Sequence, residues 1–265
     1  MKTLIQNPVV GSDPEVFAFA GHLNMIVPSF DLVGGTKEEP LNLGKEGFFI
    51  QEDNVLVEYN IPPSNTKEAF VANVHTGLNL VSGKLPDGFV PLVKSSHRFP
   101  QNMMKDPRAF IMGCEPDFNV YLEDFNPRPD MKDDPFLRSA GGHLHIGYDD
   151  SNDKINNLLV RYLDAYLGVP SVILDPDTDR RKLYGKAGAC RHKKYGVEYR
   201  TLSSFWLTSS DITGWVWDQI MLAIDKANDK EDNIIKHEAF VIDTINNGNL
   251  SSAIQFVKEN KIMLP

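Results

Sequence analysis

The stretch "GGHLHIG" at residues 141–147 places two histidines one residue apart, between glycines. If this stretch is a β-strand, alternate side chains point to the same face, so we expect His143 and His145 to face one cleft. Leu144 and Ile146 would then point to the opposite side. Two imidazoles in this arrangement can bind a metal ion, but the spacing is equally compatible with two buried histidines that have only a structural role.

Carboxylates occur in similar positions on three other predicted strands. Asp13 and Glu15 lie in "GSDPEVF", Asp53 and Glu58 in "QEDNVLVEYNIPPS", and Glu198 in "GVEYRTL". Strand alternation predicts that Asp13 and Glu15 share one face. A lone acid inside an apolar strand must face solvent, pair with a cation or bind a metal. Several carboxylates together with a histidine match Mg²⁺ or Mn²⁺ better than structural zinc.

One dense basic segment, "DRRKLYGKAGACRHKKYGVEYR" at residues 179–200, leads into the predicted strand that carries Glu198. Its cationic side chains are Arg180, Arg181, Lys182, Lys186, Arg191, Lys193, Lys194 and Arg200. Guanidinium groups suit bidentate contact with phosphate. A solvated loop or a nucleic-acid surface would also explain the charge, but the interleaved tyrosines and glycines favour a loop that binds a small ligand. Glycine-rich phosphate-binding motifs are missing from the sequence, so a nucleotide would have to be held by metals and arginines.

These residues need elements to position them, and the hydrophobic patterns predict short strands separated by single helices. Strands are predicted at 15–20, 23–27, 47–51, 55–61, 110–121, 142–148 and 196–202. Helices are predicted from Asn65 or Thr66 to Gly83, from Asp153 to a stop at Gly168 and Pro170, and in three pieces from about Asp211 to the end. Hairpins without a regular alternation of strand and helix favour an antiparallel α+β fold.

The chain has 265 residues, of which 42% are hydrophobic and 24% charged, which fits one large globular domain. Its net charge of −9 disfavours nucleic acid and anionic membranes as partners. Two cysteines, Cys114 and Cys190, are too few for a disulfide framework. No apolar run approaches the roughly 20 residues of a membrane span, so we expect a cytoplasmic location.

Five motifs, in their order along the chain, resemble the phage-type amidoligases, also called COOH·NH2 ligases. The motifs are "GSDPE", "QEDNVLVEYNIPP", "GCEPDFNVY", "GGHLHIG" and "YGKAGACRHKKYGVEYRTLSSFW". That family belongs to the superfamily of glutamine synthetase and glutamate–cysteine ligase. The resemblance covers about residues 11–207 and leaves the helical portion 208–265 without a counterpart. It implies a single catalytic domain over residues 1–265 with a glutamine-synthetase-like fold, in which an antiparallel sheet curls into a half-barrel and helices pack on its outer face.

The resemblance also implies a reaction. Enzymes of this family transfer the γ-phosphoryl group of ATP to a carboxylate, and an amine then displaces phosphate to leave an amide. The implied partners are ATP, Mg²⁺ or Mn²⁺, a carboxylate substrate, and an amine from an amino acid, peptide or polyamine. Neither nucleic acid nor a membrane is expected as a partner. A phage-encoded enzyme would work in the host cytoplasm, and the oligomeric state stays open.

Matching the motifs position by position implies roles for individual residues. The implied metal ligands are Glu15, Asp53, Glu58, His143 and Glu198. The implied catalytic residues are Arg200, Arg191 and Glu58, and the implied nucleotide contacts are His145, Arg181, Lys186 and Arg200. Whether Glu115 and Asp117 belong to the site stays open. Because an acyl-phosphate must be shielded from water, we also predict that residues 182–196 form a closing loop.

Two other kinds of function fit parts of this pattern. A metal-dependent amidohydrolase would use the same histidines and carboxylates, but would not need so many arginines beside them. A non-catalytic virion or assembly protein could keep the fold, but would have no use for the full set Glu15, Glu58, His143, Glu198 and Arg200. Nucleic-acid binding through residues 180–200 ranks last, because the rest of the chain is acidic.

Overall fold

Most of the strands join into one twelve-stranded sheet in the computed structural model, which describes residues 3–111, 116–229 and 231–265. Its main path runs β10-β9-β13-β14-β12-β1-β6-β2-β3, with β5 paired to β6, β4 to β5 and β7 to β2, while β8 and β11 form a separate pair. The pairings recorded between these strands are antiparallel. The strands are β1 (Val9–Ser12), β2 (Glu15–Ala20), β3 (Met25–Val27), β4 (Leu41–Asn42), β5 (Phe49–Asp53), β6 (Leu56–Ser64), β7 (Phe89–Leu92), β8 (Ser96–Arg98), β9 (Phe118–Asn119), β10 (Asp124–Phe125), β11 (Leu137–Ser139), β12 (Leu144–Gly147), β13 (Ala189–Lys193) and β14 (Gly196–Tyr199). The predicted antiparallel α+β class is confirmed.

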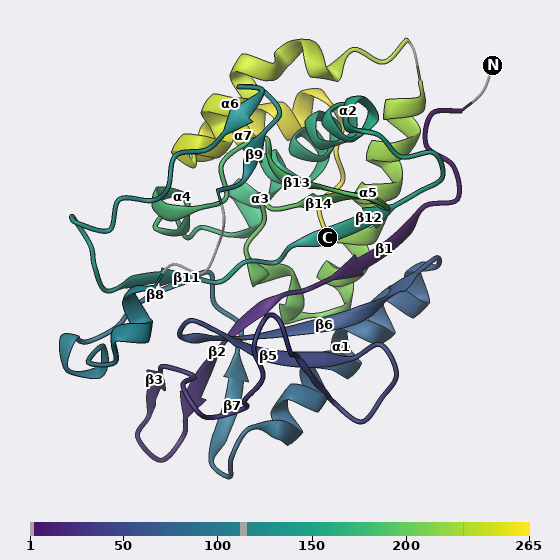
Figure 1. Ribbon diagram of the computed structural model, residues 1–265. Coiled ribbons are helices and arrows are strands. Elements are labelled where there is room, and N and C mark those ends of the chain that lie inside the picture. The colour runs from purple at the N-terminus through teal and green to yellow at the C-terminus, as the bar shows by residue number, and fades with distance from the viewer. Residues whose placement is uncertain (1–2, 112–115, 230) are drawn as a thin grey trace.

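Helices pack against this sheet from two sequence regions (Figure 1). They are α1 (Lys67–Lys84), α2 (Asp153–Leu163), α3 (Val169–Leu174), α4 (Arg180–Leu183), α5 (Ser210–Asn228), α6 (Glu238–Asn247) and α7 (Leu250–Glu259). The first begins as predicted, because the Thr66 side chain accepts a hydrogen bond from the Ala69 N–H. The three predicted C-terminal helices are α5, α6 and α7.

Strand alternation gives the sheet one apolar face and one polar face. In β6, Val57, Tyr59 and Ile61 are buried in the main core together with Phe70 of α1, while Glu58 points the other way. The strands β12 and β14 repeat this arrangement, since Leu144, Ile146, Val197 and Tyr199 belong to the same core as Leu159 and Leu163 of α2. The polar residues between them, His145 and Glu198, therefore lie on the face away from these helices.

Among the described residues of the predicted strand at 110–121, only Phe118–Asn119 (β9) forms a strand. Residues Pro107–Phe110 form a 3-10 helix, because the Asp106 side chain accepts a hydrogen bond from the Arg108 N–H and Pro107 fixes the first helical φ angle. Residues 112–115, which include Cys114 and Glu115, lie outside the described residues. In the described part of this segment, the two-residue strand β9 is what the structure has of the predicted strand.

The predicted helix stop at Gly168 and Pro170 is also wrong. The helix continues from α2 through a π-helical turn, Asp164–Gly168, directly into α3. The wider turn ends the hydrogen-bonding pattern of α2, so Pro170 falls in the first turn of α3. Proline has no N–H to donate, and Pro170 stands where the chain passes from the π-helical turn into the α-helical pattern.

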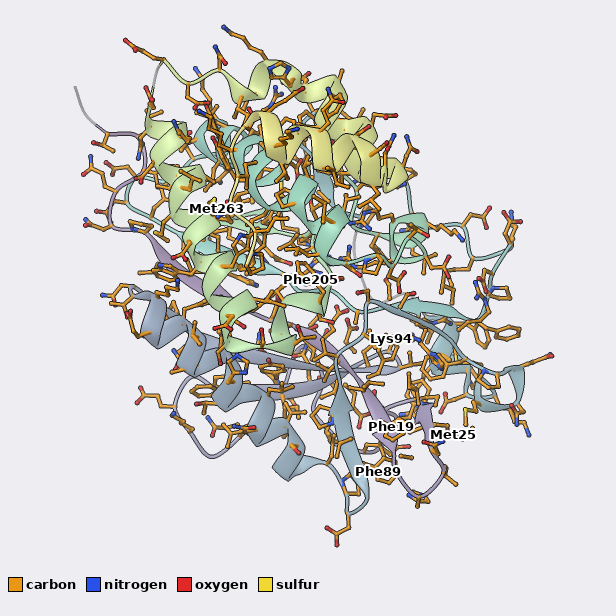
Figure 2. All side chains as sticks on the ribbon, turned by 180° about the vertical axis from the view of Figure 1, so that it is seen from behind. Phe19, Met25, Phe89, Lys94, Phe205 and Met263 are labelled. Carbon is orange, nitrogen blue, oxygen red and sulfur yellow. The ribbon has the colours of Figure 1, made fainter. Side chains whose placement is uncertain are left out.

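A second, smaller core lies on the other side of β2, and includes Phe17, Leu56, Phe99 and Ala109. Seen from behind, Phe19 of β2, Met25 of β3 and Phe89 of β7 lie at the end of the molecule away from Met263 (Figure 2). No helix in the described part of the chain is both long and apolar enough to cross a bilayer.

Candidate active site

Three functional side chains form one row across adjacent strands. His145 of β12 lies opposite Glu198 of β14, and Glu198 lies opposite Arg191 of β13. Directly opposed residues in an antiparallel sheet point to the same face with Cβ atoms about 5 Å apart. The pairing of these strands therefore brings a histidine, a carboxylate and a guanidinium together on the polar face of the sheet.

Asp13 completes a first candidate metal site with this row. Ligand atoms of Asp13, His145 and Glu198 lie within 4.8 Å of one another. Asp13 Oδ1 is 3.0 Å from His145 Nε2, yet both atoms are buried without a hydrogen-bond partner. Burial opposes ionisation of Asp13, but the neighbouring histidines outweigh it and lower the pKa of this carboxyl. Two orphaned ligand atoms beside a buried carboxylate fit a bound cation.

His143 is placed differently from His145. Its Nδ1 atom lies 3.1 Å from Arg200 Nη1. A guanidinium can only donate, so Nδ1 accepts in this contact, but the same nitrogen also lies 3.4 Å from Asp13 Oδ1. Burial and the charge of Arg200 lower the pKa of His143, which agrees with a neutral ring. His145, by contrast, contacts the Tyr195 hydroxyl through Nδ1 and turns Nε2 towards Asp13. Of the two histidines, His145 is the one that lies with Asp13 and Glu198 in the first candidate metal site.

Three carboxylates form a second candidate metal site. Glu15 of β2 lies opposite Glu58 of β6, and Asp53 ends the neighbouring strand β5. Their oxygens lie within 4.8 Å of one another. Burial and the charge of Asp53 raise the pKa of Glu15 to about 8, and burial together with nearby acids raises the pKa of Glu58 well above its usual range. A divalent cation would remove this repulsion, and the all-oxygen donor set fits Mg²⁺ or Mn²⁺.

The two carboxylate sets diverge at a single break in the chain. The strands β1 and β2 are separated by Asp13 and Pro14, and proline cannot donate to a strand ladder. Strand alternation predicted that Asp13 and Glu15 would share one face. The break instead places Asp13 with His145 and Glu15 with Glu58.

Arg200 contacts Glu198 of the first site and lines the same pocket as Glu15 and Asp53 of the second. Its Nε donates to Asp117 Oδ1 at 2.6 Å, and Nη1 contacts both His143 and Glu198. All four side chains are buried. Asp117 therefore lies among these side chains, and its carboxylate holds Arg200 in place.

Further cations surround Glu198. Lys193 Nζ is 2.8 Å from Glu198 Oε2, and Arg191 Nη1 is 3.6 Å from Oε1. Burial alone would raise the pKa of Glu198, but Arg200 and the histidines outweigh it and lower this pKa to about 2. Glu198 is therefore ionised throughout the ordinary pH range, as a metal-binding carboxylate must be.

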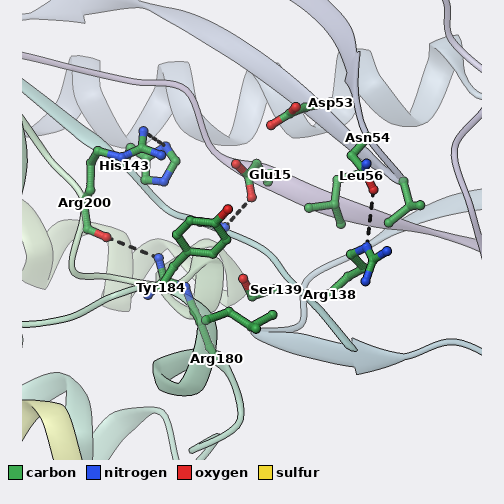
Figure 3. A pocket seen from close by; sticks show the side chains of 13 residues that line it. Glu15, Asp53, Asn54, Leu56, Arg138, Ser139, His143, Arg180, Tyr184 and Arg200 are labelled. Atoms are coloured by element: carbon green, nitrogen blue, oxygen red, sulfur yellow. Dashed lines mark hydrogen bonds between the residues drawn. The ribbon is translucent and has the colours of Figure 1, made fainter. Parts of the chain in front are cut away.

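A pocket opens beside the second site, and we call it the acid–arginine pocket (Figure 3). About 550 Å³ of space in and in front of the pocket is free of protein atoms, and this volume includes open solvent at the mouth. The charged and imidazole side chains in its lining are Glu15, Asp53, Arg138, His143, Arg180 and Arg200. Apolar walls come from Val55, Leu56 and Leu183.

Two of the predicted nucleotide contacts are not brought to these sites. Arg181 is buried but donates to the Asp177 carbonyl at 2.9 Å and to Ser171 Oγ at 3.3 Å, and it does not line the acid–arginine pocket. Its neighbour Arg180 does. Lys186 lines a separate pocket next to Asp117 and Tyr184. Glu115 lies outside the described residues.

The predicted closing loop, residues 182–196, is largely regular structure. It contains the last residues of α4 and all of β13, which pairs with both β14 and β9. The hairpin partner makes this segment part of the sheet, so Arg191 and Lys193 are carried on a strand. The sequence missed this strand because lysines and arginines obscure its alternation.

The sequence also left four contributors out of the site. Asp13, Arg180, Lys193 and Tyr195 all reach it. Asp13 had a usable signal, since it precedes Pro14 at the start of a strand that carries another acid. Arg180 and Arg181 could not be distinguished without knowing how α4 is oriented.

Replacing Glu15 with glutamine is expected to change how stability depends on pH. The folded-state pKa of Glu15 is about 8, above its ordinary 4.5, so the folded chain holds a proton that the unfolded chain loses. Metal-free stability from this group therefore falls as pH rises from about 4.5 to about 8. Glutamine resembles the protonated acid, so urea unfolding in EDTA should show Glu15→Gln gaining on the wild type at high pH. Mg²⁺ should stabilise the wild type more than the variant, whereas parallel stability curves with and without Mg²⁺ would contradict the assignment.

Comparison with known proteins adds one family match. Residues 135–260 match the family model described as Phage phiEco32-like COOH.NH2 ligase-type 2. The matched region includes the "GGHLHIG" strand and the motif that runs from Tyr184 to Trp206. No curated protein matches the chain. The chain is similar to the crystal structure of a bifunctional glutathione synthetase from Pasteurella multocida at 9% identity and a TM-score of 0.43, and the alignment covers 97% of this chain and 49% of that one. This chain thus spans about half the length of that protein.

Proposed function

We propose that this chain, whose residues 135–260 belong to the Phage phiEco32-like COOH.NH2 ligase-type 2 family, is an ATP-dependent ligase that joins a carboxylate to an amine. The observation that carries the proposal is that Arg200 contacts Glu198 of one candidate cation site and lines the same pocket as Glu15 and Asp53 of the other. Phosphoryl transfer requires the neutralisation of phosphate oxygens and alignment of the reacting groups more than it requires a protein nucleophile.

The two candidate metal sites have different donors and would take different tasks. We assign Mg²⁺ or Mn²⁺ to the set Glu15, Asp53 and Glu58, and a second ion to Asp13, His145 and Glu198. Bound divalent ions would neutralise phosphate charge and orient the reacting oxygens. Tyr195 would fix the ring of His145, and His143 would hold Arg200, which differs from the predicted role of His143 as a ligand.

In the proposed reaction, an oxygen of the acid attacks the γ-phosphorus of ATP and the bond to ADP breaks. The amine nitrogen then attacks the acyl carbon, phosphate leaves, and the amine's proton passes to a carboxylate of the Glu15 set. Arg200 and Arg191 would stabilise charge on the transferring phosphoryl group. Both already lie beside Glu198, so they need no large movement to reach a phosphate bound there.

The proposal extends to the whole chain and its surroundings. We propose that residues 1–265 act as one catalytic unit, with the sheet curled into a glutamine-synthetase-like half-barrel. The amine partner is an amino acid, peptide or polyamine, and the enzyme works in the cytoplasm without a nucleic-acid partner. The cations beside the metal sites favour a ligase over an amidohydrolase, because activation of water on a metal ion needs no clamp for phosphate.

Isotope transfer tests the proposed chemistry directly. Acids from a mixed panel, labelled with ¹⁸O in the carboxylate, are incubated with Mg²⁺, ATP and a mixture of amino acids, polyamines and short peptides. We expect ADP formation that depends on the acid, and one ¹⁸O atom in each released phosphate. Release of AMP and pyrophosphate would contradict the acyl-phosphate route, and unlabelled phosphate would indicate simple ATP hydrolysis.

A further inference from the structure

Two arginines that line the acid–arginine pocket have no carboxylate partner among the described residues. Arg138 donates to the carbonyls of Pro135, Leu137 and Ala109, and its Nε lies 3.4 Å from the side-chain oxygen of Asn54. All of these acceptors are neutral. Among the described residues, no carboxylate oxygen lies within 4.0 Å of the Arg138 guanidinium, which is the largest N···O distance of an ion pair.

Arg180 has the same kind of surroundings. It donates to the carbonyls of Ala140, Thr201 and Arg200, at 3.3, 2.8 and 3.2 Å. Its guanidinium also packs so closely against Gly185 that a Cβ atom there would lie 1.7 Å from Nη1. Arg180 is therefore fixed in position by the backbone, and no carboxylate of the described residues forms an ion pair with it, although Glu15 and Asp175 are near enough to act on its charge.

A buried charge normally has a partner of opposite sign. Both arginines are at most 4% exposed, and burial lowers the pKa of each guanidinium. The nearest acids of the pocket, Glu15 and Asp53, belong to the candidate cation site. A divalent cation there would cancel two of the three negative charges of Glu15, Asp53 and Glu58, so the remaining charge could balance only one of the two arginines, and an anionic ligand would balance the other.

The two charges do not lie at one point. Arg180 approaches Arg200 and the Glu15 end of the pocket, while Arg138 approaches Asn54 and Leu56, with Tyr184 between them in the view of Figure 3. A ligand with one anionic group could satisfy only one end. A ligand with an anionic group at each end, joined by a short apolar chain, would match both charges and the apolar walls formed by Val55, Leu56 and Leu183.

We propose that the acid–arginine pocket binds the acid substrate, and that this acid is a small dianion whose second oxyanionic group is held by Arg138. The reacting carboxylate lies at the end formed by Arg180, Arg200 and Glu15. This inference rests on the proposed ligase function for the identity of the ligand as a substrate. The second group is a carboxylate or a phosphonate-like oxyanion, since a guanidinium recognises both.

Direct binding to the full chain tests the proposal without turnover. Succinate, glutarate and adipate are titrated calorimetrically into Mg²⁺-saturated protein, each against the monoacid with the same number of carbons, and 3-phosphonopropionate is titrated as a phosphonate probe. We expect the best dianion to bind at least about tenfold more tightly than its monoanionic counterpart. Preference for the phosphonate over the dicarboxylates would identify the second group as phosphate-like. Equal affinity of dianions and monoanions, or no binding of either, would overturn the proposal.

Variants then test the role of Arg138. Arg138→Gln should lower the affinity for the dianion to that for the monoanion and leave the monoanion unaffected. The matched control is Arg181→Gln, which removes another buried arginine that donates to a backbone carbonyl but lies outside this pocket. Equal loss for both ligands would make Arg138 a structural residue and overturn its assignment. If Arg138→Gln does not fold, the wild-type titrations still decide.

The ligase function and the dianion preference can fail separately. ADP formation and ¹⁸O transfer without a preference for dianions would leave the ligase proposal standing and remove the subsite. A clear preference for dianions without ADP formation would leave the subsite standing and remove the ligase proposal.

Discussion

Replacing Arg200 with lysine is expected to lower kcat by about 10²–10³ while KM for ATP changes little. Lysine keeps the positive charge but cannot donate to Asp117, His143 and Glu198 together, as Arg200 does. The charge would then no longer be fixed where negative charge develops during phosphoryl transfer. Initial rates of ADP formation at several ATP concentrations separate the effect on kcat from the effect on KM.

Lysine is the informative substitution because alanine would do additional damage. Arg200→Ala would leave two buried carboxylates without their partner, and breaking a buried pair in this way costs about 3–5 kcal/mol of stability. Arg161→Lys is the matched control, since Arg161 forms a 2.7 Å ion pair with Glu238 outside the site. A rise in KM with kcat unchanged would instead make Arg200 a residue that binds ATP in the ground state.

Local sequence patterns predicted which side of each strand carries the chemistry. Glu58 points to the face of the sheet opposite to that of its neighbours Val57 and Tyr59, as strand alternation predicts. His145 and Glu198 likewise point away from their apolar neighbours. The match over residues 135–260 confirms the family resemblance for the last two motifs, and it extends into the C-terminal helices, for which the sequence offered no counterpart. These inferences succeed because they depend on period-two geometry and short motifs, which do not require knowledge of strand pairing.

Strand pairing and backbone breaks decide the rest, and the sequence does not encode them locally. Glu15 meets Glu58 only because β2 pairs with β6, and His145 meets Glu198 only because β12 pairs with β14. The difference between His143 and His145 arises from Asp13 and Arg200, which come from distant parts of the chain. A one-residue change of register would exchange these partners, so residue spacing alone could not assign the ligand.

Replacing Glu198 with glutamine is expected to lower ligase activity by at least about 10² and to weaken binding of Mg²⁺-ATP by at least about tenfold. The structure places Glu198 among Lys193, Arg191 and Arg200 as well as in the candidate metal site, so it could serve as a metal ligand or only as a counter-ion. These two roles predict opposite results for ATP without metal. Removal of the carboxylate takes one negative charge away from Lys193, Arg191 and Arg200, which would then attract the phosphates more strongly.

The measurement is therefore ATP affinity with Mg²⁺ and with EDTA, near neutral pH. Because the pKa of Glu198 is lowered to about 2, its ion pairs stabilise the folded chain above about pH 4.5 and are lost only as the pH falls towards 2. A metal ligand predicts weaker binding with Mg²⁺ and unchanged or tighter binding in EDTA, with Glu238→Gln behaving as wild type in both. Tighter binding under both conditions would assign Glu198 as a counter-ion alone, and the site of Asp13 and His145 would then lack its third ligand.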